Sequence, residues 1–175
     1  SLVLEINKEG KIDNINFGLS EMALKSINEK PWDEGFKKTI IHFLESYKTA
    51  YSLKRLDYIE SIFADNAVII TGYLLQVNPV EDLYSSNEIV KYNKYSKEEF
   101  LEKLDYSFRS KEYINLKFEE STVLQSGLNK NQFGIQIKQN YFSSNYGDQG
   151  YLFLLVEFDK NQIPTIHVRT CKPEK

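Results

Sequence analysis

Hydrophobic positions recur at helical spacing in one long segment near the start of the chain. From Trp32 to about Tyr51, apolar side chains return every three or four residues, which places them along one face of a helix. Asp33 and Glu34 stand in the first turn, where the helix dipole favours acidic side chains. The pattern predicts an amphipathic helix with a buried apolar face.

Three shorter helices are predicted around it. One covers residues 20–27, with Ser20 as its cap, and another covers residues 56–63 with its own apolar stripe. Asp65 and Asn66 are expected to end that second helix. The third opens at Ser96, because a serine followed three positions later by glutamate forms a capping box.

Alternating or β-branched apolar runs predict the strands. A hairpin is expected at the start of the chain, with Gly10 in its turn. The last four strands are separated by short turns, which favours an antiparallel meander. The predicted strands are residues 2–6, 12–17, 67–75, 88–95, 113–124, 132–143, 150–158 and 165–171.

This order of elements predicts an α+β fold in which the helices cover one face of the sheet. A curved antiparallel sheet wrapped around the long helix would form a cone with a pocket at its wide end. We divide the chain into an N-terminal β-hairpin appendage at residues 1–30 and a main domain at residues 31–175. A two-stranded hairpin is marginal alone, so the appendage must lean on the main domain or on a partner.

Composition narrows the class of protein. The 175 residues are 41% hydrophobic and 27% charged, as in an average soluble globular domain. The net charge of −3 argues against a nucleic-acid partner, because phosphates require a concentrated basic face. The apolar runs are too short to insert this segment into a membrane. The chain starts abruptly in a strand, so we expect an export signal or membrane anchor upstream of Ser1.

Several segments resemble a known superfamily. Residues 43–47 and 57–68, the second containing Phe-Ala-Asp-Asn-Ala, and the later strands look like the nuclear transport factor two-like superfamily, over roughly residues 32–171. That superfamily includes ketosteroid isomerase, scytalone dehydratase and SnoaL-like polyketide cyclases. Residues 133–141, 150–154 and 166–170 look more narrowly like uncharacterised bacterial envelope-associated members. The resemblance implies a cone-like, cystatin-like fold and fixes no activity.

The resemblance to ketosteroid isomerase can be compared residue by residue. An ungapped match on Phe63–Ala67 places the oxyanion-binding tyrosine at Tyr47. The base position falls on Thr71, which cannot take a proton from carbon at neutral pH, and the second acid falls near Leu154. Two of the three catalytic groups are therefore missing, and the isomerase mechanism is not expected.

Four hydroxyl-bearing residues are candidates for the pocket wall. Tyr47 and Tyr51 lie on the apolar stripe of the long helix, and Thr71 and Tyr73 alternate on the strand at 67–75. The alternative for each tyrosine is a core residue whose hydroxyl forms a hydrogen bond with the backbone. Residues on one face of a strand point the same way, so Thr71 and Tyr73 should face the pocket together.

The last two strands add three candidates and exclude one mechanism. Alternation places His167 and Arg169 on one strand face, where they would hold an anion or simply face solvent. Glu157 would have a raised pKa and serve as an acid or base if its strand face were buried. Cys171 lies about 13 Å from His167 along a strand, too far for a nucleophile and its base.

Metal and cofactor sites are not predicted. The two histidines are far apart in sequence, there is one cysteine, and the spacings typical of zinc ligands are missing. Asp148 stands in Tyr-Gly-Asp-Gln-Gly, which we interpret as a turn, because a calcium loop would supply several oxygens. No cofactor is therefore assigned.

The functional hypothesis is a non-catalytic module of an exported or envelope bacterial protein that binds a small apolar molecule or a protein partner. We expect a hollow poor in proton-transfer groups. One alternative is an isomerase- or dehydratase-type enzyme in which Glu157 or His167 works with Tyr47. Another alternative is a structural domain that dimerises through the open face of its sheet.

Overall fold

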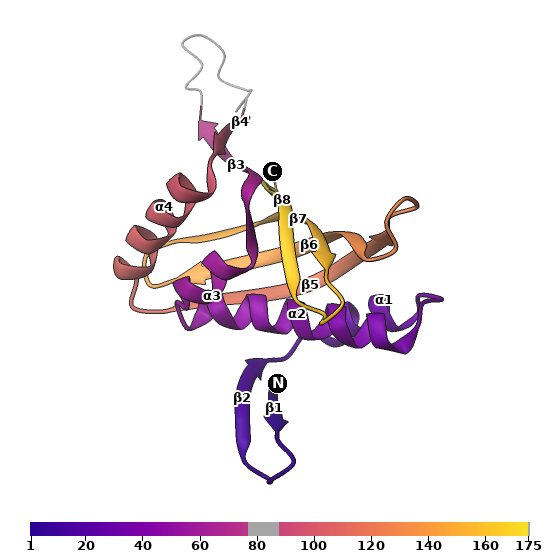
Figure 1. Cartoon of the computed structure of the whole chain (residues 1–175). Coiled ribbons are helices and arrows are strands. Elements are labelled where there is room, and N and C mark those ends of the chain that lie inside the picture. The colour runs from indigo at the N-terminus through magenta and orange to yellow at the C-terminus, as the bar shows by residue number, and fades with distance from the viewer. Residues whose placement is uncertain (77–87, 175) are drawn as a thin grey trace.

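The computed structural model describes residues 1–76 and 88–174, and Figure 1 shows how their helices and strands are arranged. The helices are α1 (Glu21–Asn28), α2 (Glu34–Ser52), α3 (Leu56–Ser61) and α4 (Lys97–Arg109). The strands are β1 (Leu2–Ile6), β2 (Ile12–Phe17), β3 (Phe63–Gln76), β4 (Glu88–Tyr95), β5 (Ile114–Gln125), β6 (Gln132–Ser143), β7 (Gly147–Phe158) and β8 (Pro164–Pro173).

The main sheet has six strands in the order β4-β3-β8-β7-β6-β5. Strands β5 to β8 form the predicted antiparallel meander. The pairing of β3 with β8 is parallel, which differs from the antiparallel sheet that we predicted. The α+β fold with a curved sheet around α2 is confirmed (Figure 1).

Two β-bulges contribute to the bending of the sheet. In β5 the register with β6 shifts between Phe118 and Ser121, so β5 carries one extra residue there. In β8, Ile166 pairs with Val156 while Val168 pairs with Leu155, which leaves His167 as the extra residue. A bulge bends its strand and increases its twist, and both bulges therefore help the sheet to curve around the helix.

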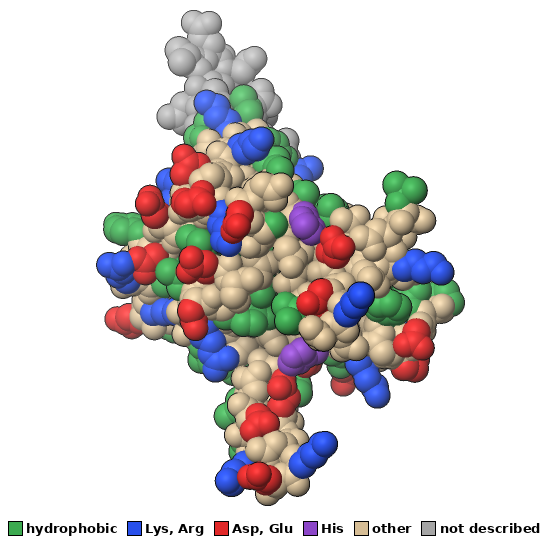
Figure 2. Space-filling view, viewed as in Figure 1, with side chains coloured by type: hydrophobic (Ala, Val, Ile, Leu, Met, Phe, Trp, Pro, Cys, Tyr) green, Lys and Arg blue, Asp and Glu red, His purple; other side chains and the backbone are tan. Residues whose placement is uncertain are grey.

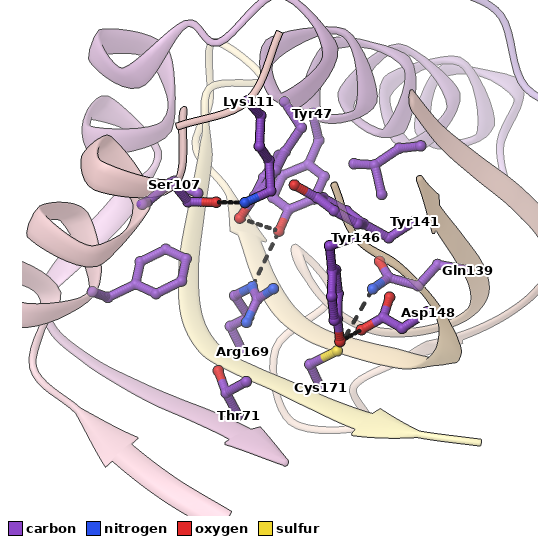
Figure 3. A pocket seen from close by; sticks show the side chains of 14 residues that line it. Tyr47, Thr71, Ser107, Lys111, Gln139, Tyr141, Tyr146, Asp148, Arg169 and Cys171 are labelled. Atoms are coloured by element: carbon purple, nitrogen blue, oxygen red, sulfur yellow. Dashed lines mark hydrogen bonds between the residues drawn. The ribbon is translucent and has the colours of Figure 1, made fainter. Parts of the chain in front are cut away.

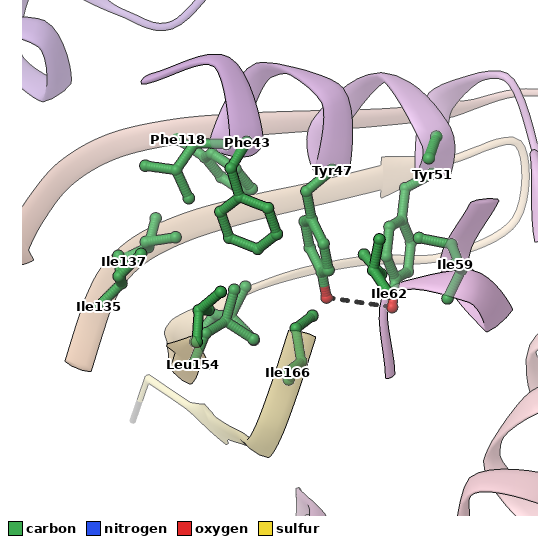
Figure 4. Packing of buried hydrophobic residues seen from close by; sticks show 14 of the residues in the cluster. Phe43, Tyr47, Tyr51, Ile59, Ile62, Phe118, Ile135, Ile137, Leu154 and Ile166 are labelled. Atoms are coloured by element: carbon green, nitrogen blue, oxygen red, sulfur yellow. Dashed lines mark hydrogen bonds between the residues drawn. The ribbon is translucent and has the colours of Figure 1, made fainter. Parts of the chain in front are cut away.

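The core fills the space between α2 and the concave face of the sheet (Figure 4). Phe43 and Tyr47 of α2 pack over Phe118 of β5 and toward Leu154 and Ile166 on the facing strands. Each fully buried side chain of this size contributes about 1.5–3 kcal/mol of stabilisation. This packing fixes α2, and hence its tyrosines, relative to the sheet.

Local sequence explains where the helices begin and end. The Asp33 carboxylate accepts a hydrogen bond from the Gly35 N–H and caps α2, and the predicted capping box of Ser96 and Glu99 opens α4. Helix α3 ends at Ser61, earlier than predicted, because β3 begins at Phe63, which pairs with Ile166 of β8. Strand pairing overrides the helical pattern in that stretch.

The N-terminal hairpin projects from the body of the molecule (Figure 1). Its turn uses Gly10 with a φ of 81°, a conformation that glycine adopts at little cost. The polar face turns toward α2, with Asn16 buried and Glu5 beside His42. The apolar face is exposed and carries Leu2, Leu4, Ile6, Ile12 and Ile15.

Helix α1 follows the hairpin and packs against β5. Its Ala23 and Ile27 are fully buried and belong to the main core cluster. Within residues 1–30, only the hairpin therefore stands apart from the core. The boundary at residue 30 stays a prediction.

The surface carries both signs of charge. Figure 2 shows acidic and basic side chains interspersed over the face of the molecule in view. Across residues 1–76 and 88–174, no helix combines the length and the apolar character that crossing a membrane requires.

Candidate functional site

A pocket of about 260 Å³ lies between the C-terminal half of α2, helix α4 and the concave side of the sheet. It is partly open to solvent. Much of its wall is apolar or aromatic, including Tyr51, Phe100, Leu104, Leu116 and Tyr141. Such a wall, with a few converging polar groups, is typical of a small-molecule site.

Two tyrosines of α2 reach the pocket because they lie one helical turn apart on its buried face. The Tyr47 hydroxyl donates a hydrogen bond to the Tyr51 hydroxyl, with the oxygens 3.2 Å apart (Figures 3 and 4). Burial raises the pKa of Tyr51 well above its ordinary value. The Tyr51 phenol therefore stays protonated at neutral pH, and both hydroxyls act as hydrogen-bonding groups.

Arg169 of β8 is a buried cation in this pocket wall. Its side chain is buried, and its Nε donates to the Tyr47 hydroxyl over 3.2 Å (Figure 3). Its guanidinium carbon lies 5.0 Å from the centre of the Phe100 ring, a distance at which a cation is attracted to the ring face. The geometry fixes the guanidinium at the pocket.

Asp148 at the start of β7 lines the same pocket as Arg169 and lies next to Tyr146 (Figure 3). The Tyr146 hydroxyl donates to Oδ2 of Asp148 over 2.9 Å. Burial raises the pKa of Asp148 above its ordinary value, and the Tyr146 hydrogen bond and the charge of Arg169 oppose that rise. Asp148 is therefore a titratable carboxyl group in the pocket wall.

Cys171 lies two residues beyond Arg169 and lines the same pocket. Its sulfur is 3.5 Å from the Nε2 atom of Gln139 on β6. Burial raises the pKa of the Cys171 thiol, so the neutral thiol predominates at neutral pH. A thiol in this form is a poor nucleophile.

Four of the seven residues predicted for the site line this pocket: Tyr47, Tyr51, Thr71 and Arg169. Tyr73 does not join them. It lies two residues further along β3 and lines a second hollow, which shares Tyr146 and Asp148 with the first. The expectation that Thr71 and Tyr73 face the pocket together is therefore not met.

Glu157 and His167 lie outside the pocket. They contact each other, with 3.2 Å between Glu157 Oε2 and His167 Nε2, and Asn129 also donates to Glu157. The buried face of β7 carries Leu154 and Val156, so Glu157 is on the opposite, partly exposed face. The burial on which the predicted acid–base role of Glu157 depends is therefore not observed.

The bulge at His167 explains why His167 and Arg169 separate. Simple alternation would place both on one face of β8. The extra residue changes the alternation, so that Ile166 and Arg169 are both buried while His167 is only half-buried and turned toward Glu157. The predicted exposed His–Arg pair is absent from the described residues.

Sequence reasoning missed the most polar part of the site. Asp148 was interpreted as a turn residue, yet β7 begins at Gly147 and Asp148 pairs with Tyr141 inside the sheet. The available signal was the even spacing of Asp148 with Gly150, Leu152 and Leu154, which places Asp148 on the inward face. The hollow thus contains a carboxyl group and a thiol, and our expectation of a hollow poor in proton-transfer groups is wrong.

Metal-ligating side chains do not gather in the part of the chain that the structure describes. No group of three or more histidine, cysteine, aspartate or glutamate side chains lies within reach of one ion in residues 1–76 and 88–174. The pocket itself offers Asp148 and Cys171, together with the amide of Gln139.

Comparison with known proteins shows likeness in structure only. No protein-family model matches the chain, and no curated protein matches its sequence. The structure of Bd1075 from Bdellovibrio bacteriovorus superposes with a TM-score of 0.60 at 12% identity, covering 81% of this chain and 42% of that one. This chain therefore spans less than half the length of that protein.

Two further structures are matched over nearly their whole length. Nuclear transport factor 2 from Cryptosporidium parvum gives a TM-score of 0.55 at 8% identity, covering 81% of this chain and 97% of that one. A putative dehydratase of the NTF2-like family from Streptomyces avermitilis gives 0.56 at 13% identity, covering 79% and 95%. The chain has the nuclear transport factor 2-like fold, which occurs in enzymes and in non-catalytic binding proteins.

Proposed function

We propose that this domain is a ligand-binding module whose pocket, between α2, α4 and the sheet, binds a small aromatic or apolar molecule without transforming it. The observation that carries the proposal is the partly open pocket of about 260 Å³ with its aromatic wall. Thr71, at the position where the resemblance to ketosteroid isomerase would require a base, lines this pocket and offers only a hydroxyl. The aromatic wall favours binding of an apolar molecule, and Thr71 cannot act as the base that the resemblance to ketosteroid isomerase would require.

Calorimetric titration with 2-naphthol, a neutral bicyclic aromatic compound, tests this proposal. The decisive variant is Ser107→Phe, because Ser107 lines the pocket from α4 and a phenyl ring there would occupy the cavity. The matched control is Ser110→Phe, which adds the same ring to an exposed position at the end of the same helix. We expect 2-naphthol to bind the wild type and the control but not Ser107→Phe. Equal binding to all three would place the binding elsewhere and overturn the proposal.

A second candidate function is acid–base catalysis, and the pair of Asp148 and Tyr146 favours it. A carboxyl group with a raised pKa, hydrogen-bonded to a phenol at 2.9 Å in a pocket that also holds Arg169, has the elements needed to remove a proton next to a carbonyl. This candidate replaces the alternative built on Glu157 and His167, which face away from Tyr47.

Proton exchange distinguishes the two candidates. The methyl protons of 2-acetylnaphthalene would be followed by NMR in deuterated buffer with and without the protein. A binding module leaves their exchange rate unchanged. An acid–base enzyme accelerates it, and Asp148→Asn then returns the rate to that of buffer.

We also propose that the domain belongs to an exported or envelope protein of a bacterium. The support is the resemblance of residues 133–141, 150–154 and 166–170 to bacterial envelope-associated proteins. Fractionation of cells that produce the protein from its own gene, followed by immunodetection of this domain, provides the test. Recovery in the cytosolic fraction alone would contradict the assignment.

A further inference from the structure

Arg169 is a buried cation, and one of its guanidinium nitrogens has no hydrogen-bond partner among the described residues. Only 8% of the residue is exposed, and its guanidinium is charged at all accessible pH values. Nε donates to Tyr47, and one face of the group lies over the Phe100 ring. Its Nη1 atom is buried and has no hydrogen-bond partner among the residues that the structure describes.

No carboxylate from residues 1–76 or 88–174 forms an ion pair with Arg169. Asp148 is the acidic side chain that lines the pocket, and its hydrogen bond comes from Tyr146. Lys111 supplies a second cation to the wall and donates to the Ser107 hydroxyl. The pocket therefore holds two cations and one carboxyl group, and burial opposes the ionisation of that carboxyl group.

A buried charge without a counter-ion is costly, and proteins normally pair such a charge or use it to bind a ligand. An anion that enters this pocket would supply the missing partner. A guanidinium matches a carboxylate in shape, because both groups are planar and can form parallel N–H···O bonds. The site presents one guanidinium within a largely apolar wall, which suits a single planar carboxylate better than a phosphate with its greater charge.

The other residues of the pocket wall indicate what the rest of the ligand is like. Tyr47, Tyr51 and Phe100 present ring surfaces on the side of Arg169, and Tyr141 lines the pocket from β6. Ring surfaces of this kind pack against flat, apolar groups. We propose that the natural ligand is a small aromatic carboxylic acid, bound as its anion with the carboxylate on Arg169. This inference rests on the proposed binding function and names the ligand class for the same pocket.

The test compares two probes of the same shape and different charge. 2-Naphthoate carries the carboxylate, and 2-naphthamide replaces it with a neutral amide. We expect calorimetry at neutral pH to show that wild-type protein binds 2-naphthoate about tenfold to a hundredfold more tightly, as a charge-assisted hydrogen bond provides. Comparing two probes on one protein does not depend on whether any variant folds.

Variants of Arg169 locate the preference. Arg169→Gln should abolish the difference between the two probes, and Arg169→Lys should retain a smaller difference, because lysine keeps the charge without the planar fork. 2-Naphthyl phosphate tests the other source of negative charge, and tighter binding of the phosphate than of the carboxylate would overturn the assignment to carboxylates.

The outcomes separate this inference from the proposed function. Equal affinities for 2-naphthoate and 2-naphthamide, both lost in Ser107→Phe, would overturn the assignment of an acidic ligand and keep the pocket as the binding site. A preference for 2-naphthoate that persists in Arg169→Gln would also overturn it, because another group would then hold the anion. If no naphthyl probe binds the wild type, both proposals fail.

Discussion

The Nε atom of Arg169 and the hydroxyl oxygen of Tyr47 lie 3.2 Å apart in the buried wall of the pocket, although 122 residues separate them in the chain. Tyr47 in turn donates to Tyr51, so that a helix and the last strand are linked through one phenol. These two hydrogen bonds are buried and lie beside the pocket. A substitution at Tyr47 is therefore expected to affect both the stability of the core and the properties of the pocket.

Tyr47→Phe should therefore cost more stability than Tyr51→Phe. Removing the Tyr47 hydroxyl deprives the charged Nε of Arg169 of its acceptor and deprives Tyr51 of its donor. Leaving a buried donor unpaired costs about 1–3 kcal/mol, and more when the group is charged. Tyr51→Phe removes only the acceptor of a neutral phenol. Urea unfolding of both variants, with unchanged m-values, makes the comparison, and equal losses would show that the Arg169 contact contributes nothing.

Arg169→Met should leave the free energy of unfolding unchanged or raise it by about 1 kcal/mol or more, because a buried charge without a counter-ion is replaced by an apolar side chain of similar length. Thermal unfolding without ligand measures this effect. The Tyr47→Phe change should then cost less in the Arg169→Met background than in the wild type, since the unpaired Nε is gone. A large loss of stability in Arg169→Met would show that its hydrogen bond and its contact with Phe100 outweigh the cost of burying the charge.

Sequence patterns predicted the elements well where one local signal dominated. The capping box at Ser96 starts α4 as expected, and the alternation in β6 gave its bounds, Gln132–Ser143, without error. The stripe of α2 predicted the buried helix face that carries Tyr47 and Tyr51, and both residues line the pocket. In each case the helix or strand could be predicted from the sequence of that element alone.

The site was only partly predictable because its geometry depends on contacts between distant segments. Nothing local marks His167 as a bulge, since the register shift arises from pairing with β7. The same holds for Asp148, whose inward orientation follows from its pairing with Tyr141 in β6. The residues around Asp148 have the composition of a turn, but Asp148 itself lies in strand β7.

Asp148→Asn should change how stability depends on pH. Burial raises the pKa of Asp148 in the folded state above its ordinary value of 3.8, so the folded protein holds this proton more firmly than the unfolded chain. The resulting stabilisation is complete below the unfolded pKa and is lost as the pH rises through the folded pKa. The variant keeps an oxygen that can accept from Tyr146, and it should lack this decline in stability.

Glu102→Gln, which neutralises an exposed carboxylate on α4, is the control for Asp148→Asn. Urea midpoints measured from pH 3.5 to 7 provide the comparison. The Asp148→Asn variant should also bind 2-naphthoate at least as tightly as the wild type at neutral pH, because asparagine carries no negative charge that would oppose the ligand. A decline with pH that is identical in Asp148→Asn and the wild type would show that another group is responsible.

Thr49→Val should loosen the N-terminal hairpin from α2. The Thr49 hydroxyl accepts a hydrogen bond from the Phe17 N–H at 2.7 Å and donates to the Glu45 carbonyl within the helix, also at 2.7 Å. Valine has the same shape and leaves the Phe17 amide without its partner, at a cost of about 1–3 kcal/mol. Thr39→Val is the matched control, because Thr39 donates to the Gly35 carbonyl in the same way and its side chain lines a different hollow, with Asn131 and Phe158. Hydrogen exchange at the Phe17 amide should accelerate in Thr49→Val and stay unchanged in Thr39→Val. Equal exchange in both variants would mean that the neighbouring contacts, Leu19 N–H to Glu45 and Lys48 to the Gly18 carbonyl, hold the hairpin without Thr49.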